Sequence, residues 1–249
     1  MALTGSDFGA TLDAVAVRPW ASFEVKAGQT LRMGPTRTGA RCYLCVHGGI
    51  DVKPLLGSAS THLLSRLGGL EGRTLRKGDV LKIGESKARF RKRAVPARAL
   101  EGLAPRKVLR VTPGPQSDWF PEATRRIFYG GTYRVAEESN RMGLRLEGAT
   151  ITEGAPGEMI SEGVSLGAVQ IAAGGLPIIL FVEQQTTGGY AKIANVISAD
   201  MHSLGQLRPR NQIRFERVTF DLAWKMLIEQ EKLLASKDLI VETTWDCRC

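Results

Sequence analysis

Short apolar runs broken by turn-forming residues constrain the fold of this 249-residue chain more than any other feature. Runs of Val, Ile, Leu and aromatic residues extend for only a few positions before Gly, Pro or Asp interrupts them. The chain contains 28 glycines and 11 prolines, which turns favour and helix interiors exclude. Runs of this kind, separated by turn signals, are typical of β-strands. The pattern predicts a mainly β protein with few helices.

Individual runs can be assigned to elements. In the first half, strands are expected at residues 23–25, 30–33, 41–47 and 80–83. In the second half, residues 108–111 predict a strand. Residues 169–172 and 178–181 predict a hairpin of two buried strands around Gly174 and Gly175.

Two helices are expected in the second half. Residues 117–128, which follow a Pro-Gly-Pro turn, predict a short one. A longer helix is expected to begin at Asp221 as its cap. Its apolar residues share one stripe, which favours core packing over a partner-binding face: Leu222, Met226, Leu227, Leu233 and Leu234.

A basic segment divides the chain. Residues 94–107 hold Pro96 and Pro105 amid Ala and Arg, which is typical of a connector. We therefore expect an N-terminal β-rich lobe at residues 1–93 and a C-terminal lobe at residues 108–249. Eight Lys and Arg residues against Glu101 give residues 87–107 a charge of +7 (8 − 1), out of +9 for the whole chain. Because that segment offers one aromatic residue for base stacking, nucleic-acid binding is disfavoured.

Two absent sequence features indicate the cellular compartment of the protein. No N-terminal stretch resembles a signal peptide. The longest apolar stretch, residues 167–182, is short for a membrane span and contains Gly174, Gly175 and Pro177. A cytoplasmic location is the expectation.

The four cysteines, Cys42, Cys45, Cys247 and Cys249, are too few and too unevenly placed for a disulfide framework. Residues three apart on a strand point to opposite faces, so Cys42 and Cys45 are not expected to chelate a metal together. No metal site is predicted.

Three passages carry a family resemblance. They comprise residues 39–52 with 56–61 and 68–73, residues 110–116 with 139–148, and residues 161–170 with 185–190. In this order they resemble the biotin-dependent carboxyltransferase-like family, which includes the C subunit of 5-oxoprolinase, KipA and allophanate hydrolase subunit 2. The resemblance implies a cyclophilin-like β-barrel architecture in two lobes, in agreement with the β-rich pattern.

The sequence departs from the family pattern in two places. Family members usually begin with a further segment carrying Gln-Asp-Gly and Gly-Ala-Met-Asp motifs, whereas this chain opens at Ala2-Leu-Thr-Gly-Ser-Asp7. We expect this family segment to be missing. Ala59 also stands where the family has Arg, and this argues against anion binding at that point.

The run Gln185-Thr186-Thr187-Gly188-Gly189-Tyr190 is the principal candidate site. Its side chains donate and accept hydrogen bonds, and its two glycines permit close approach to the backbone, so the run suits an amide or a carboxylate. A β-turn with purely local hydrogen bonds is the alternative. If the following segment is extended, Lys192 points to the same side as Tyr190 and could polarise a carbonyl, while Asp200 could act as general base. Both could instead be solvated surface residues.

Other candidates are weaker. Arg141 could hold a carboxylate in a bidentate pair, or it could pair with Glu137 or Glu138. The hydroxyls of Ser60 and Thr61 could join the same pocket if the two lobes face each other.

Cofactors are expected to come from elsewhere. The sequence contains neither a phosphate-binding loop ending in Lys-Ser or Lys-Thr nor an Ala-Met-Lys-Met biotinylation motif. We expect no cofactor bound tightly by this chain. The resemblance implies ATP, or carboxybiotin, used by a complex with the KipI-like B subunit of 5-oxoprolinase and its lactam-utilisation A subunit.

The resemblance implies one principal function and two alternatives. The first is a subunit of an ATP-dependent 5-oxoprolinase, a hydrolase that opens 5-oxoproline to glutamate and is inactive as an isolated chain. The alternatives are a urea- or allophanate-type carboxyltransferase component, and a KipA-like regulator that binds a KipI-like protein without catalysis.

Overall fold

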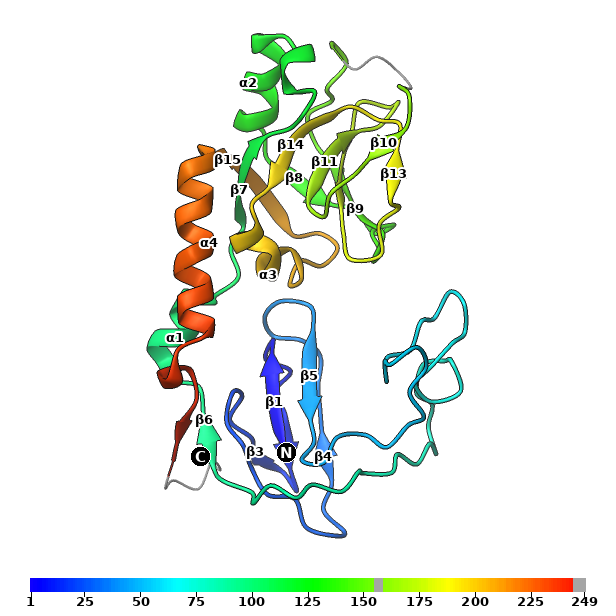
Figure 1. Ribbon diagram of the computed structural model, residues 1–249, viewed down its shortest axis with the longest axis vertical. Helices are drawn as coiled ribbons and strands as arrows, with labels where there is room; N and C mark the ends of the chain where they lie inside the picture. The colour runs from blue at the N-terminus through cyan, green and yellow to red at the C-terminus, as the bar shows by residue number, and fades with distance from the viewer. Residues whose placement is uncertain (155–158, 244–249) are drawn as a thin grey trace. The chain divides into compact units, whose positions relative to one another are not determined.

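The chain folds into two compact units in the computed structural model, which describes residues 1–154 and 159–243 (Figure 1). Unit 1 comprises Met1–Pro35, Cys42–Ala94 and, of the described residues at the C-terminal end, 242–243. Unit 2 comprises Thr36–Arg41 and Val95–Val241. The chain enters the long segment of unit 2 between Ala94 and Val95, at the start of the predicted connector.

Unit 2 is built on a closed barrel of seven strands in the order β11-β12-β9-β8-β15-β7-β14. Strands β15 and β7 are parallel, and every other neighbouring pair is antiparallel. Closure leaves no sheet edge unpaired. The strands are β7 (Val108–Pro113), β8 (Tyr133–Val135), β9 (Gly143–Glu147), β11 (Ala168–Ile171), β12 (Pro177–Leu180), β14 (Lys192–Val196) and β15 (Gln212–Arg217).

The barrel interior is the main core of unit 2. Alternate residues such as Leu109 and Val111 of β7 are fully buried, as the two-residue period of a strand requires. Aromatic rings extend this core, with Phe128 stacked on Phe215 at 4.6 Å between ring centroids. The phenol of Tyr133 is buried beside them, and this burial raises its pKa to about 12.

The helices are few, and all but one of them are short. They are α1 (Ala97–Gly102), α2 (Glu122–Gly130), α3 (Met201–Leu204) and α4 (Phe220–Leu234), with single turns η1 (Ser117–Trp119), η2 (Ser198–Asp200) and η3 (Lys237–Leu239). The predicted helix at residues 117–128 is thus divided into η1 and α2. The reason is Pro121, which disfavours helical geometry at the residue before it.

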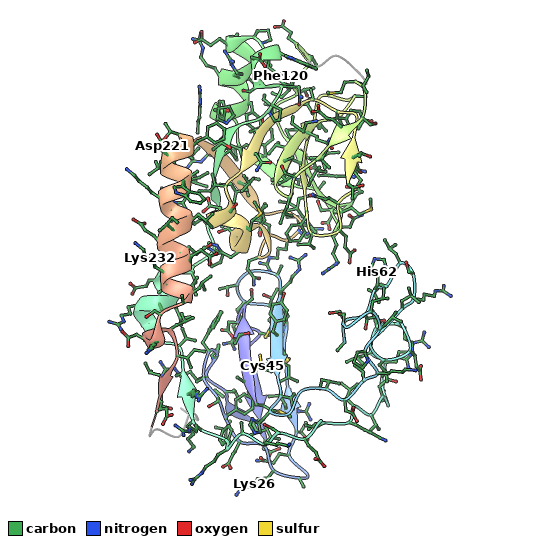
Figure 2. All side chains as sticks on the ribbon, viewed as in Figure 1. Lys26, Cys45, His62, Phe120, Asp221 and Lys232 are labelled. Carbon is green, nitrogen blue, oxygen red and sulfur yellow. The ribbon has the colours of Figure 1, made fainter. Side chains whose placement is uncertain are left out.

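The structure corrects two predictions about α4. Its cap is Thr219, whose Oγ1 accepts a hydrogen bond from the Leu222 backbone N–H at 3.2 Å. Asp221 lies in the first turn instead, with Lys232 in the last (Figure 2). The apolar stripe is core only in part: Met226 packs against a cluster of buried residues, but no residue of α4 is fully buried and Leu222 is 41% exposed.

Unit 1 has short strands and a small core. Strand β1 (Ala2–Gly5) pairs with β5 (Cys42–Cys45), β2 (Thr11–Leu12) lies between β3 (Val15–Ala16) and β4 (Leu31–Arg32), and β6 (Arg93–Ala94) pairs with β16 (Val241–Glu242). Leu3, Leu12 and Phe23 are the largest core residues. The strands predicted at residues 23–25 and 80–83 are wrong. Residue 83 makes only an isolated bridge, to Ile50.

The mainly β fold with few helices is confirmed, and so is the hairpin of β11 and β12. Among the described residues, no helix is long and apolar enough to cross a membrane. Cys42 and Cys45 are free thiols at the ends of β5. No group of three or more metal-ligating side chains occurs within residues 1–154 and 159–243. Cys247 and Cys249 lie outside the described residues.

Candidate functional site

A buried lysine forms the centre of the candidate site. Lys192 is the first residue of β14 and is only 2% exposed. Its Nζ lies 2.6 Å from Oε1 of Glu162, which belongs to the short strand β10 (Glu162–Gly163). Burying an ammonium is costly unless a counter-charge and hydrogen bonds compensate, and Glu162 supplies that counter-charge.

Gln116 joins the lysine to the glutamate. Its Nε2 donates to Glu162 Oε1 at 2.7 Å, and its Oε1 accepts from the Lys192 backbone N–H at 3.1 Å. The Gln116 backbone N–H also donates to the Lys192 carbonyl at 3.2 Å. The hydrogen bond from Lys192, and secondly that from Gln116, lower the pKa of Glu162. Glu162 therefore remains ionised at neutral pH, and the cluster is an ordered ion pair.

The predicted run 185–190 lies beside this cluster. Its strand β13 (Thr187–Gly188) pairs antiparallel with β10, so that Gly188 lies opposite Glu162. Further bonds continue the pairing on both sides: Val164 N–H donates to the Thr186 carbonyl at 3.1 Å, and Met159 N–H donates to the Gly189 carbonyl at 2.8 Å. The run is therefore part of a β-ladder. Thr186 and Thr187 are exposed along it, and Gln185 is exposed just before them.

A second glutamine completes the site. Gln170 of β11 is paired with Lys192 across a β-bulge and is 2% exposed. Its Nε2 has no hydrogen-bond partner among the described residues. A Cβ placed on Gly188 would lie 2.7 Å from this nitrogen and 2.9 Å from Nε2 of Gln185. The absence of a side chain at Gly188 thus leaves room for both carboxamides, which are the ends of flexible side chains.

Asp200 has a different environment. It is fully buried in η2, and its Oδ2 accepts from the backbone N–H of Arg110 at 2.8 Å and from Nε at 3.1 Å. A second guanidinium nitrogen of Arg110 binds Oδ1. The Asp200 hydrogen bond raises the pKa of Arg110. Both carboxylate oxygens are therefore engaged within the protein.

The remaining predicted residues are also placed. Arg141 pairs with Glu183, Nε to Oε1 at 2.7 Å, rather than with Glu137 or Glu138. This pair fixes the segment that leads into residue 185. Ser60 and Thr61 belong to unit 1, where they line an apolar hollow of about 590 Å³.

Sequence reasoning did not single out Glu162, Gln116 or Gln170. A signal was present for Gln170, because a glutamine within the otherwise apolar strand Ala168–Ile171 is an exception to the rule that buried strands are apolar. Gln116 and Glu162 lie within residues 110–116 and 161–170, two of the passages that carry the family resemblance, but their role depends on their contact with Lys192.

Fold and candidate site together describe a closed β-barrel with a cluster of polar side chains around Lys192. A buried ammonium, a carboxylate and carboxamides with free donor capacity can bind a carbonyl or carboxylate oxygen. The chain belongs to the family described as carboxyltransferase domain, subdomain A and B, which matches residues 1–217.

Curated relatives make the comparison more specific. The chain is 39% identical to the 5-oxoprolinase C subunit of Escherichia coli over 231 residues, which is 93% of this chain and 73% of that protein. It is 36% identical to the 5-oxoprolinase C subunit of Haemophilus influenzae, covering 96% of this chain and 76% of that protein. It is 31% identical to urea amidolyase of Saccharomyces cerevisiae, covering 96% of this chain and 14% of that enzyme.

Solved structures agree on the fold. The crystal structure of the K. lactis urea amidolyase superposes with a TM-score of 0.82 at 29% identity over 96% of this chain. The Kluyveromyces lactis urea carboxylase gives the same score. This chain spans only 16% and 24% of those two proteins.

Proposed function

We propose that this chain is a subunit of an ATP-dependent 5-oxoprolinase, which opens 5-oxoproline to glutamate together with partner subunits. The observation that carries the proposal is the 39% identity to the E. coli 5-oxoprolinase C subunit over 93% of the chain. The match at 36% identity to the H. influenzae protein supports it further.

The proposed reaction breaks the C–N bond of the lactam ring. One water supplies the oxygen of the new side-chain carboxylate, and the ring nitrogen becomes the amine of glutamate. A second water is consumed as ATP becomes ADP and phosphate, which drives the ring opening. The chain's own contribution is to bind and polarise the amide.

Within the site, Lys192 is the proposed catalytic residue. Its ammonium, held by Glu162 at 2.6 Å, supplies a fixed positive charge for oxygen as negative charge develops there. The run 185–190 supplies donors and acceptors for the substrate. Asp200 is proposed as a positioning residue, because both of its oxygens already bind Arg110. Arg141 is proposed to order residue 185 through Glu183, and Ser60 and Thr61 remain proposed substrate contacts.

The resemblance also supplies the partners of the proposal. A KipI-like B subunit and a lactam-utilisation A subunit complete the enzyme, and the isolated chain is inactive. ATP is bound by the complex, since no phosphate-binding loop occurs in this sequence. The proposed location is the cytoplasm.

A urea-type carboxyltransferase is the second candidate. The TM-score of 0.82 to urea amidolyase and the 31% identity to its yeast relative favour it. In this case carboxybiotin would be delivered by another domain and urea would take the place of the lactam.

The test is 5-oxoproline-dependent ATP hydrolysis, with glutamate quantified, by the chain co-purified with its two proposed partners. Assemblies lacking the chain should be inactive. Lys192→Met should abolish activity, whereas Lys232→Met, which removes an exposed lysine from α4, should not. Full activity without the chain would refute the proposal. Urea-dependent ATP hydrolysis with a biotin carboxylase would favour the second candidate.

A further inference from the structure

The carboxamide of Gln170 is buried with an unused donor. Its Nε2 has no hydrogen-bond partner among the described residues, and the side chain is 2% exposed. Its neighbours on β11, Val169 and Ile171, are buried apolar residues. A buried amide without a partner weakens the fold, so its presence in an apolar strand calls for a physical reason.

The position of this donor supplies the reason. Gln170 is paired with Lys192 at a β-bulge, a feature that redirects side chains and is common beside active sites. Its Nε2 also approaches Gly188, which lies opposite Glu162 in the β10–β13 ladder. Gln170 is therefore a ladder neighbour of Lys192, and its unused donor approaches the residue that lies opposite Glu162, whose side chain is 42% exposed.

Gln170 differs from the other donors of the cluster. Lys192 Nζ binds Glu162 and donates to the Tyr190 carbonyl at 3.5 Å, and Gln116 Nε2 binds the same carboxylate oxygen. These two groups hold the cluster together, and the ammonium, which has three N–H donors, still supplies positive charge to a substrate oxygen. Gln170 Nε2 has no such partner among the described residues, and a substrate carbonyl would satisfy it.

We infer that Gln170 is a specificity-determining residue, whose carboxamide N–H donates a hydrogen bond to the carbonyl oxygen of the amide substrate. This inference rests on the proposed function and assigns one of its contacts. Gly188 serves the same purpose by leaving room for the carboxamide, since a Cβ there would lie 2.7 Å from Nε2.

Gln170→Met is the principal test, because it keeps the length of the side chain and removes the donor. In the assembled enzyme, KM for 5-oxoproline should rise by about tenfold or more, which corresponds to about 1.4 kcal/mol. The thermal midpoint should stay the same or rise, because a buried unsatisfied polar group is removed. Affinity for 5-oxoproline thus falls while the thermal midpoint does not. Replacing a glutamine that only stabilised the fold would instead lower the midpoint and leave KM unchanged.

Two controls accompany the Gln170→Met variant. Ile171→Val removes one methylene from the barrel core next to Gln170, and should lower the midpoint while leaving KM unchanged. Proline, which lacks the ring carbonyl, serves as a competitor. Its inhibition constant should be the same in wild type and Gln170→Met, because the lost hydrogen bond is to the carbonyl.

Gly188→Ala supplies a second, independent perturbation. Its Cβ should push the Gln170 carboxamide aside and raise KM, and the double variant with Gln170→Met should add little further loss. Additive losses, or a Gln170→Met enzyme with unchanged KM and a lower midpoint, would overturn the inference.

Failure of the proposed function can be distinguished from failure of this inference. In that case the wild-type assembly turns over no 5-oxoproline. Binding of 5-oxoproline and of urea to the chain is then measured by titration calorimetry in wild type and Gln170→Met. Weaker binding of either compound to the variant supports the inference, and absent or equal binding of both overturns it.

Discussion

Replacing Asp200 with Asn should destabilise the protein rather than remove a catalytic base. Asp200 is 0% exposed, and its carboxylate accepts from the backbone N–H and from two guanidinium nitrogens of Arg110. The Arg110 side chain is only 12% exposed. Asn keeps the shape of the residue, but it leaves this guanidinium without a counter-charge in a poorly solvated position.

The expected loss is about 3 kcal/mol. Breaking a buried ion pair by removing one partner costs about 3–5 kcal/mol, and the lower end applies because Arg110 retains some contact with solvent. For a chain of this size, each kcal/mol shifts the thermal midpoint by roughly 2–4 °C, so a decrease of about 6–12 °C is expected. The Arg110 guanidinium also contacts the sulfur of Met226 at 2.9 Å, so part of α4 should loosen with it.

Differential scanning calorimetry and urea unfolding of the whole chain measure this loss. Glu147→Gln is the matched control, since the Glu147–Arg134 pair is 44% and 57% exposed and should contribute about 0–1 kcal/mol. An Asp200→Asn protein with an unchanged midpoint and no activity would refute the structural argument. It would restore Asp200 as a group that acts on the substrate.

Three further outcomes are expected. Glu162→Gln should lower kcat by about tenfold or more in steady-state assays of the assembly, because Lys192 loses its counter-charge; unchanged kinetics would contradict this. The hydrogen bond from Arg73 lowers the pKa of Asp79 from 3.8 to about 2, so their pairing stabilises unit 1 above pH 3.8 and is lost as the pH falls through 2. The Arg76 backbone N–H donates to Asp79 Oδ2 at 2.7 Å, so its hydrogen exchange should speed up relative to neighbouring amides as the pH falls from 3.8 through 2, and Asp79→Asn should abolish this dependence. Phe128→Ala should cost about 3–5 kcal/mol in urea unfolding, and a loss below about 1 kcal/mol would contradict the core assignment.

Local sequence pattern was sufficient for much of unit 2. The apolar runs at residues 108–111, 169–172 and 178–181 became β7, β11 and β12, because strand period and turn residues are encoded within a few positions. The same reasoning failed at residues 80–83, where an apolar run has only one bridging partner. Strand propensity is realised only where a neighbouring strand satisfies the backbone.

The capping and burial of α4 show a second limit. Both Thr219 and Asp221 are good caps, and the choice depends on which backbone N–H groups the helix leaves free. Amphipathic spacing identified the helix correctly. Whether its apolar stripe is buried depends on what packs against it, and sequence spacing carries no information about that.

By itself, the sequence determined the mainly β fold and the family. Only the tertiary structure decided which polar residues meet. Gln116 and Lys192 are 76 positions apart, and Arg110 and Asp200 are 90 apart. Their contacts follow from the pairing of β14 with β7 and β11 as the barrel closes. The two-residue period of a strand shows which of its residues share a face. Closure of the barrel determines which residues of other strands they contact.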